Sequence, residues 1–268
     1  MKGLIRILEL NKIYNEDCIG EKGMCLIPDK SVDMILCDLP YGTTACRWDT
    51  VIPFKLLWSQ YERIIKNDGA IVLTAMQPFT TELIHSKLNL FKYNWVWDKG
   101  KAGNIFTAKL KPLQTHEDIC VFSKGTVANC SNKLMKYNPQ MIEMDKSRKY
   151  KIYNQSELYE RINTKSIEYE TKQKYPKSII YFPNTNQKGK IHPTQKPVEL
   201  FEYLIKTYTN EGETVLDNCM GSGTTAIACI NTKRNYIGFE WCPDEPHDTY
   251  FKLANKRIEE HLDNIKSV

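Results

Sequence analysis

The sequence of 268 residues lacks an apolar run of about 18 residues, the length that crosses a bilayer as a helix. Its first residues also lack the long apolar region and the small-residue cleavage site of a secretory signal. The nine cysteines are scattered and form no Cys-x-x-Cys pair, which argues against a zinc site or a disulfide framework. We therefore expect a cytoplasmic protein with reduced thiols, no metal and no membrane partner.

A strong overall charge is also missing, because the net charge is only +5. The charge is nevertheless uneven. Residues 126–190 contain 13 Lys and Arg against 6 Asp and Glu, a net of +7, whereas the rest contains 24 against 26, a net of −2. Such a basic segment suits a polyanion, because phosphate contacts release condensed counterions. A solvated Lys-rich face is the alternative interpretation.

Hydrophobic periodicity predicts one α/β domain with an insertion. Strands are predicted at residues 32–38, 70–75, 93–97, 117–123, 214–218 and 236–240, and helices at residues 54–66, 78–90, 197–208, 224–231 and 248–266. This alternation is typical of a mostly parallel sheet with helices on both faces. The pattern degrades from about residue 125 to residue 175, which indicates a less regular inserted segment.

A glycine-rich loop follows the predicted strand at 214–218. Gly221-x-Gly223-x-x-Ala226 matches the dinucleotide-binding fingerprint, and Glu240 ends the next strand 17 residues beyond Gly223. A carboxylate at that position can accept hydrogen bonds from both ribose hydroxyls of a nucleoside. The loop therefore predicts an adenosyl-type cofactor and leaves NAD and S-adenosylmethionine open; a tight turn without a ligand is the alternative.

A second short motif, Asp38-Leu39-Pro40-Tyr41, lies at the carboxyl end of a predicted strand, where ligands bind in open α/β sheets. An exocyclic amine on a heteroaromatic base is a poor nucleophile until its two N–H groups are held. Asp38 can accept one of them and the backbone carbonyl of Leu39 the other, while Pro40 stiffens the turn. Tyr41 offers an aromatic face to an extruded base. In isolation the motif could be a surface turn; together with the glycine loop it indicates methyl transfer to an amine.

Three motifs in chain order carry a resemblance to a known family: Asp38-Leu39-Pro40-Tyr41, His192-Pro193-Thr194-Gln195-Lys196-Pro197, and Leu216-Asp217 followed by Met220-Gly221-Ser222-Gly223-Thr224-Thr225. They resemble the amino-methylating (N6-adenine or N4-cytosine) DNA methyltransferases of the β class. The resemblance implies a Rossmann-like class I methyltransferase fold, with a seven-stranded, mostly parallel sheet that contains one reversed strand. It implies a catalytic part at residues 1–125, an inserted target-recognition region at 126–190 and a cofactor-binding part of the same domain at 191–268.

The resemblance also implies S-adenosyl-L-methionine as cofactor and assigns residues to it. Asp17 and Cys18 would line the adenine pocket, and Lys196 would pair with the carboxylate of the methionine moiety. The full implied cofactor-binding set is Asp17, Cys18, Asp38, Thr194, Gln195, Lys196, Asp217, Cys219, Gly221, Ser222, Gly223, Thr224, Thr225 and Glu240.

The implied catalytic residues are Asp38, Leu39, Pro40 and Tyr41. The sequence departs from the family pattern twice. Leu39 replaces a proline. This change should be tolerated because the group that accepts the amine N–H is the backbone carbonyl. Asn218-Cys219 replaces Pro-Phe, and the smaller Cys219 should loosen a contact with the cofactor.

The resemblance implies double-stranded DNA as partner, and we expect basic and polar side chains to contact it. The candidates are Thr43, Arg47, Lys99, Lys133, Lys136, Arg148, Lys149 and Lys151. Asp38 favours adenine N6 as the acceptor, after base flipping, because N4-cytosine specificity more often goes with Ser. RNA or protein-amide methylation, which usually goes with Asn, and a catalytically silent DNA-binding module are competing interpretations.

The expected setting is the cytoplasm of a bacterial or phage-infected cell, in restriction–modification or as an orphan enzyme. Dimerisation occurs in the class, so a homodimer is compatible with the sequence.

Overall fold

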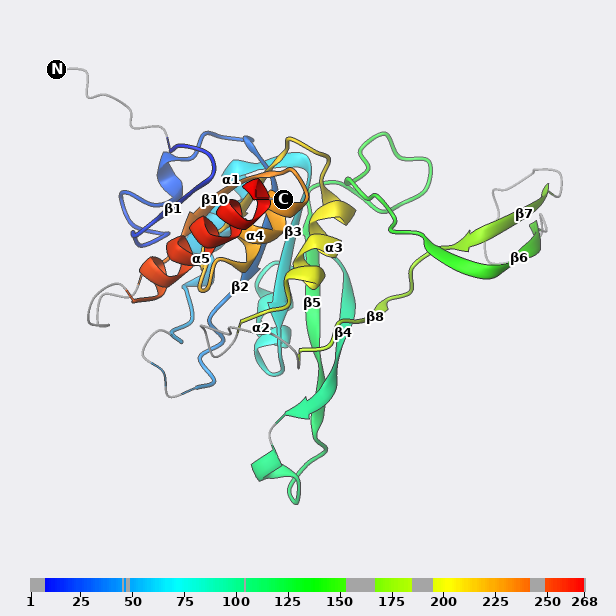
Figure 1. The fold of residues 1–268 in the computed structure, drawn as a ribbon, viewed down its shortest axis with the longest axis horizontal. Helices are drawn as coiled ribbons and strands as arrows, with labels where there is room; N and C mark the ends of the chain where they lie inside the picture. The colour runs from blue at the N-terminus through cyan, green and yellow to red at the C-terminus, as the bar shows by residue number, and fades with distance from the viewer. Residues whose placement is uncertain are drawn as a thin grey trace. The chain divides into compact units, whose positions relative to one another are not determined.

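The computed structural model of the chain describes residues 8–44, 46, 49–103, 105–152, 167–184, 195–241 and 249–267. The chain forms two compact units, one from Met1–Asn138 with Ser178–Val268 and one from Pro139–Lys177 (Figure 1). The second unit is shorter than the predicted insertion at 126–190, because residues 126–138 and the residues from Ser178 onward group with the first unit. Its role in target recognition stays a prediction.

The first unit is built on a sheet of eight described strands in the order β1-β10-β9-β2-β3-β5-β4-β8. Their bounds are β1 Lys12–Tyr14, β2 Val32–Asp38, β3 Ile65–Ala75, β4 Phe91–Gly103, β5 Gln114–Ser123, β8 Ile179–Tyr181, β9 Thr214–Asp217 and β10 Asn235–Phe239. Neighbouring strands run parallel, except that β5 runs antiparallel to β3 and to β4. The mostly parallel sheet with one reversed strand is confirmed. It has eight strands where seven were implied, and the periodicity did not predict the three-residue edge strands β1 and β8.

Helices cover both faces of this sheet, as predicted (Figure 1). They are α1 Phe54–Ile64, α2 Phe79–Ser86, α3 Val198–Tyr208, α4 Thr224–Asn231 and α5 Thr249–Lys266, with 3-10 turns at η1 Met24–Leu26 and η2 Ile105–Thr107. Successive side chains of a strand point to opposite faces. Ile35 and Cys37 of β2 accordingly pack in the cluster that contains α1 and α2, and Met34 and Leu36 pack in the cluster that contains α3, α4 and α5. The site-bearing strand is therefore buried on both sides.

Two predicted helices end earlier than expected. The helix predicted at 54–66 ends at Ile64, because Ile65 is buried in extended backbone and begins β3. The helix predicted at 78–90 ends at Ser86, and Phe91 already begins β4. Apolar residues that continue from a helix into a strand carry no boundary signal in the hydrophobic pattern. No helix in the described part of the chain is long and apolar enough to cross a membrane.

The second unit is a two-stranded antiparallel sheet of β6 (Ile142–Ile152) and β7 (Ile167–Lys174). Tyr150 and Tyr169 face each other across it, with ring centroids 5.5 Å apart and planes at 21°. Cross-strand aromatic pairs of this kind stabilise an otherwise marginal hairpin. The hydrophobic pattern indicated only irregular structure here, because most side chains of these strands are exposed and polar.

Candidate active site

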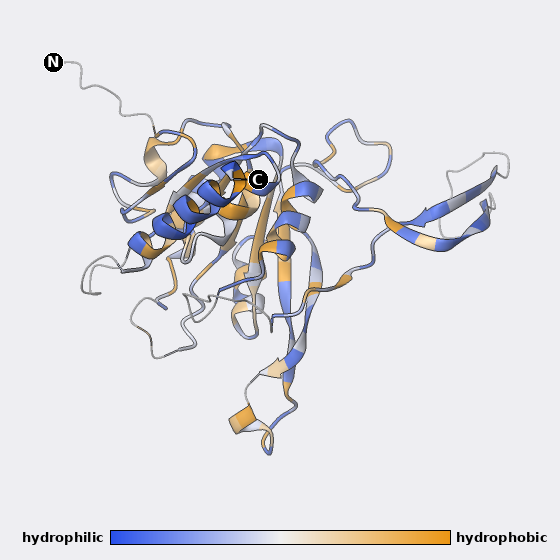
Figure 2. Cartoon of the chain, in the orientation of Figure 1, coloured by the Kyte–Doolittle hydropathy of each residue, from blue (hydrophilic) through white to orange (hydrophobic). Residues whose placement is uncertain are grey.

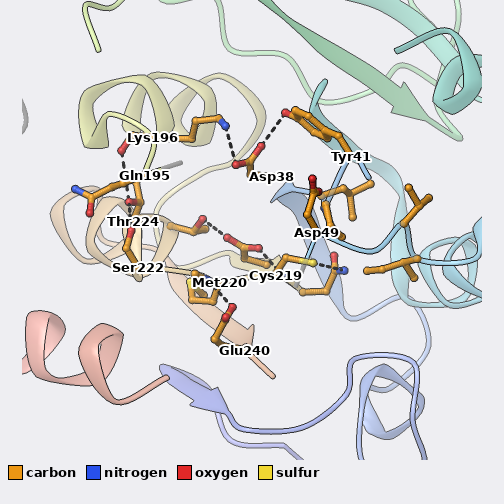
Figure 3. A pocket seen from close by; sticks show the side chains of 18 of the residues that line it. Asp38, Tyr41, Asp49, Gln195, Lys196, Cys219, Met220, Ser222, Thr224 and Glu240 are labelled. Atoms are coloured by element: carbon orange, nitrogen blue, oxygen red, sulfur yellow. Dashed lines mark hydrogen bonds and ion pairs between the residues drawn. The ribbon is translucent and has the colours of Figure 1, made fainter. Parts of the chain in front are cut away.

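The two motifs meet because their strands are neighbours. β2 ends at Asp38 and β9 ends at Asp217, and the strands pair in parallel with Met34 opposite Val215. The carboxyl ends of parallel strands lie at one edge of the sheet, so residues 179 positions apart in the chain open into one pocket of about 740 Å³ (Figure 3).

Most of the predicted site residues line this pocket. They are Asp17, Cys18, Asp38, Leu39, Pro40, Tyr41, Thr43, Lys99, Gln195, Lys196, Asp217, Cys219, Gly221, Ser222, Thr224, Thr225 and Glu240. Gly223 caps the N-terminus of α4 instead. Thr194 and Arg47 lie outside the described residues, as does the His192-Pro193-Thr194 part of its motif.

The Asp38 carboxylate is held from both sides. Its Oδ1 accepts hydrogen bonds from the hydroxyls of Tyr41, at 2.8 Å, and Thr74, which lies opposite Asp38 on β3. Its Oδ2 accepts a bond from the ammonium of Lys196 at 2.6 Å. Figure 3 shows Lys196 and Tyr41 approaching Asp38 from opposite directions. The carboxylate is thus fixed in orientation, and one lone pair of Oδ2 remains for a ligand.

Lys196 also pairs with a residue that the sequence did not single out. Its Nζ lies 3.5 Å from Oε2 of Glu117, on the reversed strand β5, and Oε1 of Glu117 lies 3.1 Å from Nζ of Lys99. Two carboxylates and two ammonium groups therefore alternate at the pocket wall. The resemblance implied that Lys196 pairs with a cofactor carboxylate; here Asp38 and Glu117 engage it, and the cofactor contact stays a prediction.

The pKa values of this cluster follow from its pairing. Burial lowers the pKa of Lys196, but Asp38 and Glu117 outweigh it and raise the pKa above the ordinary value. Burial raises the pKa of Glu117, but Lys196 and Lys99 bring it below the ordinary value. Both groups stay charged at neutral pH.

Tyr41 has one face covered and its hydroxyl engaged. Its ring stacks on Phe79 with centroids 5.0 Å apart and planes at 27°. Burial, then the charge of Asp38, raises the pKa of Tyr41 well above its ordinary value, so the hydroxyl remains a donor. The packing leaves the ring fixed beside Asp38.

Asp49 fixes the loop that follows the catalytic motif. Its carboxylate accepts the backbone N–H groups of Gly42 at 2.9 Å, Thr43 at 2.9 Å and Thr44 at 2.7 Å. Burial raises the pKa of Asp49, but these bonds and the Thr44 hydroxyl lower it overall. Gly42 has φ of +69°, a conformation that favours glycine. A single buried carboxylate thus sets the path of the loop over the pocket.

The cofactor side is built from a glycine loop and two carboxylates. Gly221 and Gly223 have φ of +54° and +76°. Glu240 accepts the N–H of Gly221 at 2.7 Å, and Asp217 accepts the hydroxyl of Thr225 and the N–H of Cys219. Burial raises the pKa of Asp217 to about 6 and that of Glu240 to about 7. Among the described residues, neither carboxylate forms an ion pair with Lys or Arg.

The Asn218-Cys219 departure has a local structural explanation. The side-chain oxygen Oδ1 of Asn218 accepts a hydrogen bond from the buried Tyr61 hydroxyl. The side-chain nitrogen Nδ2 of Asn218 lies 3.6 Å from the Cys18 sulfur and 3.5 Å from the Cys219 sulfur. A small polar cluster thus occupies the pocket floor beside the glycine loop.

These features fit an adenosyl cofactor that carries positive charge. The glycine loop allows close backbone approach, and Glu240 faces the pocket at the end of β10. Asp217 is buried and Glu240 is half-buried, and two such carboxylates without a cationic partner in the described chain suit a ligand that carries positive charge.

Some of the predicted DNA-binding residues form ion pairs within the chain, and others are exposed. Lys136 is paired with Glu213 and lies 3.8 Å from Asp33, and Lys151 lies 2.7 Å from Glu168. Lys133 is exposed in the first unit, and Arg148 and Lys149 are exposed on β6. Contact of any of them with DNA stays a prediction.

The fold and the pocket together define a Rossmann-like α/β protein in which a glycine loop and the Asp38 carboxylate line one pocket at the carboxyl ends of the strands. The model of the DNA methylase family of N6 and N4 methyltransferases matches residues 32–245. This is most of the chain, and the chain belongs to that family. The protein is a DNA methyltransferase, and its cofactor is the S-adenosyl-L-methionine of the family.

Similar proteins match along most of their length. The type II methyltransferase M1.MboII of Moraxella bovis is 26% identical over 94% of this chain and 100% of its own. The DNA adenine methyltransferase YhdJ of Escherichia coli (strain K12) is 27% identical over 94% of this chain and 83% of its own. The structure of PvuII DNA methyltransferase (cytosine-N4-specific) superposes with a TM-score of 0.62 at 15% identity, covering 97% of this chain and 93% of that one. At that identity the likeness concerns the fold alone.

Proposed function

We propose that this protein transfers a methyl group to N6 of adenine in duplex DNA, after the base has left the helix. The observation that carries the proposal is the Asp38 carboxylate, fixed by Tyr41, Thr74 and Lys196 in a pocket that it shares with the cofactor loop. Such a fixed acceptor can hold an amine N–H without reorganising during the reaction.

The residues of the chain have distinct tasks in this mechanism. The remaining lone pair of Asp38 Oδ2 accepts one N–H of the adenine amine, and the Leu39 carbonyl accepts the other. Lys196, which also pairs with Glu117, keeps Asp38 oriented. Nitrogen then leans toward sp3 geometry and presents its lone pair. Asp38 is also the acceptor nearest to the proton that the amine loses after transfer.

Cofactor binding falls to the other side of the pocket. The sulfonium of S-adenosylmethionine supplies the methyl group when it is bound. Glu240 would accept the ribose hydroxyls, Asp217 would attract the positively charged amine, and the Gly221 backbone would allow close approach.

The choice of adenine N6 rests on Asp38 and is supported by similarity to an enzyme named as an adenine methyltransferase. N4-cytosine methylation is the second candidate, because the family includes N4 enzymes and the cytosine-N4-specific PvuII enzyme shares the fold. Both acceptors are exocyclic amines and need the same two hydrogen-bond acceptors.

We also propose that the protein acts on duplex DNA in the cytoplasm of a bacterial or phage-infected cell, as its type II relative suggests. The exposed Arg148 and Lys149 on β6 would hold phosphates. Changing both to Glu should weaken DNA binding. The slope of log K against log salt concentration should fall by about the amount expected for two lost phosphate contacts. Unchanged affinity and salt slope would place the DNA surface elsewhere.

The deciding experiment is to incubate the protein with unmethylated duplex DNA and S-adenosylmethionine, digest the DNA to nucleosides and identify the product by mass spectrometry. N6-methyladenine is expected, with Asp38→Ala as the inactive control. N4-methylcytosine would keep the mechanism and overturn the base assignment. DNA binding without any methyl mark would favour the catalytically silent module.

A further inference from the structure

The hairpin formed by β4 and β5 carries an exposed apolar tip. Phe106 is 98% exposed, Leu110 is 84% exposed and Ile105 is 72% exposed. Figure 2 shows the turn η2 at this tip in the colour of hydrophobic residues. Large apolar side chains that cluster at nearly full exposure mark an interaction site more often than a solvated surface.

The charge around the tip has one sign. Residues 99–116 contain four Lys and neither Asp nor Glu, although the chain outside residues 126–190 has a net charge of −2. Lys99 is paired with Glu117 at the base of the hairpin. The other three, Lys101, Lys109 and Lys111, are exposed and flank the apolar tip.

The hairpin begins at the pocket. Lys99, Gly103, Gln114 and Glu117 all line it, and Gly103 pairs with Gln114 across the two strands. Phe106 lies in the 3-10 turn η2 and comes three positions after Gly103 in the chain, so the apolar tip follows directly on the residues that line the pocket.

We propose that this tip is a wedge for duplex DNA beside the target base. Lys101, Lys109 and Lys111 hold backbone phosphates, and Phe106 enters the base stack and replaces the stacking that the flipped base gives up. Apolar wedges flanked by basic side chains are a known way to unstack a base step, and flipping requires that unstacking. The inference rests on the proposed function, because that function makes duplex DNA the substrate.

The charge pattern favours DNA over a second copy of the chain. A two-fold contact between identical tips would bring the same lysines face to face. A polyanion instead satisfies the lysines and accepts the aromatic ring in one binding event.

The test compares Phe106→Ala with Leu88→Ala, which removes an exposed leucine near the opposite end of β4. The target site is first located by sequencing DNA that the wild-type protein has methylated. Duplexes with 2-aminopurine at the target base then report flipping by fluorescence, and single-turnover methylation is measured on a paired duplex and on one mispaired at the target.

Phe106→Ala is expected to lower flipping and single-turnover methylation at least tenfold on the paired duplex, to regain most of the rate on the mispaired duplex, and to keep the affinity for S-adenosylmethionine. Leu88→Ala should match the wild type in all assays. The double change Lys109→Glu with Lys111→Glu should weaken duplex binding and reduce the salt slope by about two phosphate contacts.

Equal losses on paired and mispaired duplexes, or no loss on either, would overturn the wedge. A change of oligomeric state in Phe106→Ala without DNA, measured by analytical ultracentrifugation, would overturn it in favour of a subunit contact. If the wild-type protein methylates no DNA, the proposed function fails. If it methylates and the variant behaves as wild type, only the wedge fails.

Discussion

The two sides of the pocket hold carboxylates in opposite electrostatic states. On the catalytic side, Asp38 and Glu117 share the ammonium of Lys196, Glu117 also pairs with Lys99, and two negative charges thus face two positive ones before any ligand arrives. On the cofactor side, Asp217 and Glu240 have no cationic partner in the described chain, and burial raises their pKa values to about 6 and about 7. Asp38 and Asp217 end neighbouring strands, β2 and β9, so the difference between these two comes from the surrounding side chains and not from their position in the sheet.

This difference matches the two tasks of the pocket, catalysis on one side and cofactor binding on the other. A carboxylate that must hold an amine during the reaction needs a fixed direction, and the bond from Lys196 helps to provide it. A carboxylate that receives a cationic, ribose-bearing cofactor gains more if its charge is uncompensated beforehand, because binding then relieves the cost of burying it. Substitutions on each side of the pocket test this contrast, and their expected effects differ widely in size.

Replacing Asp38 by Asn should have the largest effect. The variant keeps the size of the side chain but loses a charge-assisted acceptor, so transfer should fall about a thousandfold, the upper range for removing one preorganised group. Affinity for S-adenosylmethionine should stay within about threefold, because Glu117 still pairs with Lys196. Single-turnover kinetics and calorimetry measure the two effects, with the exposed Asp68→Asn as the matched control. Substantial transfer by Asp38→Asn would refute the catalytic role.

Glu117→Gln should have the next largest effect, although Glu117 is a positioning residue. Losing it leaves Lys196 and Lys99 without a shared partner and should lower the free energy of unfolding by about 3 kcal/mol. Glu117 helps to raise the pKa of Lys196. Its loss should therefore lower that pKa and move the alkaline limb of the pH–rate profile to lower pH. A merely structural role would reduce stability and leave that limb where it is.

The pH dependence of cofactor affinity tests the cofactor side of the pocket. Burial raises the pKa of Glu240 from its ordinary 4.5 to about 7, so below about pH 7 the carboxyl is protonated and accepts ribose hydroxyls poorly. The Kd for S-adenosylmethionine should rise as the pH falls below 7, by at most about tenfold per unit for one group.

Stability of the ligand-free protein should change in the opposite direction. The raised pKa contributes stability that is complete below pH 4.5 and is lost as the pH rises through about 7. Thermal melts and calorimetry on the wild type and on Glu240→Gln, from about pH 5 to about pH 8, check both trends. A variant with the same pH profile as the wild type would exclude Glu240 as the group that titrates.

Gly223→Ala should have the smallest effect and should act on the cofactor side alone. Gly223 has φ of +76°, and an added Cβ would lie 3.4 Å from Ala254 and Ile258 of α5. The left-handed conformation should cost about 1 kcal/mol of stability. Affinity for S-adenosylmethionine should fall a few-fold, while the transfer rate at saturating cofactor stays unchanged. An equal loss in the transfer rate would mean that the two sides of the pocket are coupled.

The sequence predicted the ends of the central strands well, because each ends an apolar run with a chemically distinctive motif. The predicted helix at 224–231 coincides with α4, since Gly223 marks its start. Glu117 escaped prediction because nothing local distinguishes it. It reaches Lys196 only because β5 is reversed and lies between β3 and β4, and that strand order is a property of the whole sheet.

The ends of helices were harder to predict where an apolar run continues from a helix into a strand, as at Ile64 and Ile65. The hairpin of β6 and β7 was missed for a different reason. Its strands bury little, so they lack the alternation by which a half-buried strand is recognised.

The pairing of β2 with β9 also constrains how the protein is made. Met34 pairs with Val215, so a ribosome that adds about 5–20 residues per second synthesises β9 roughly 10–35 s after β2. During that interval one apolar edge of β2 has no strand to pair with, and the nascent chain carries a surface that favours aggregation. The pairing that removes this hazard also joins the strands that hold Asp38 and Asp217, so the same contact protects the chain from aggregation and brings the two sides of the pocket together.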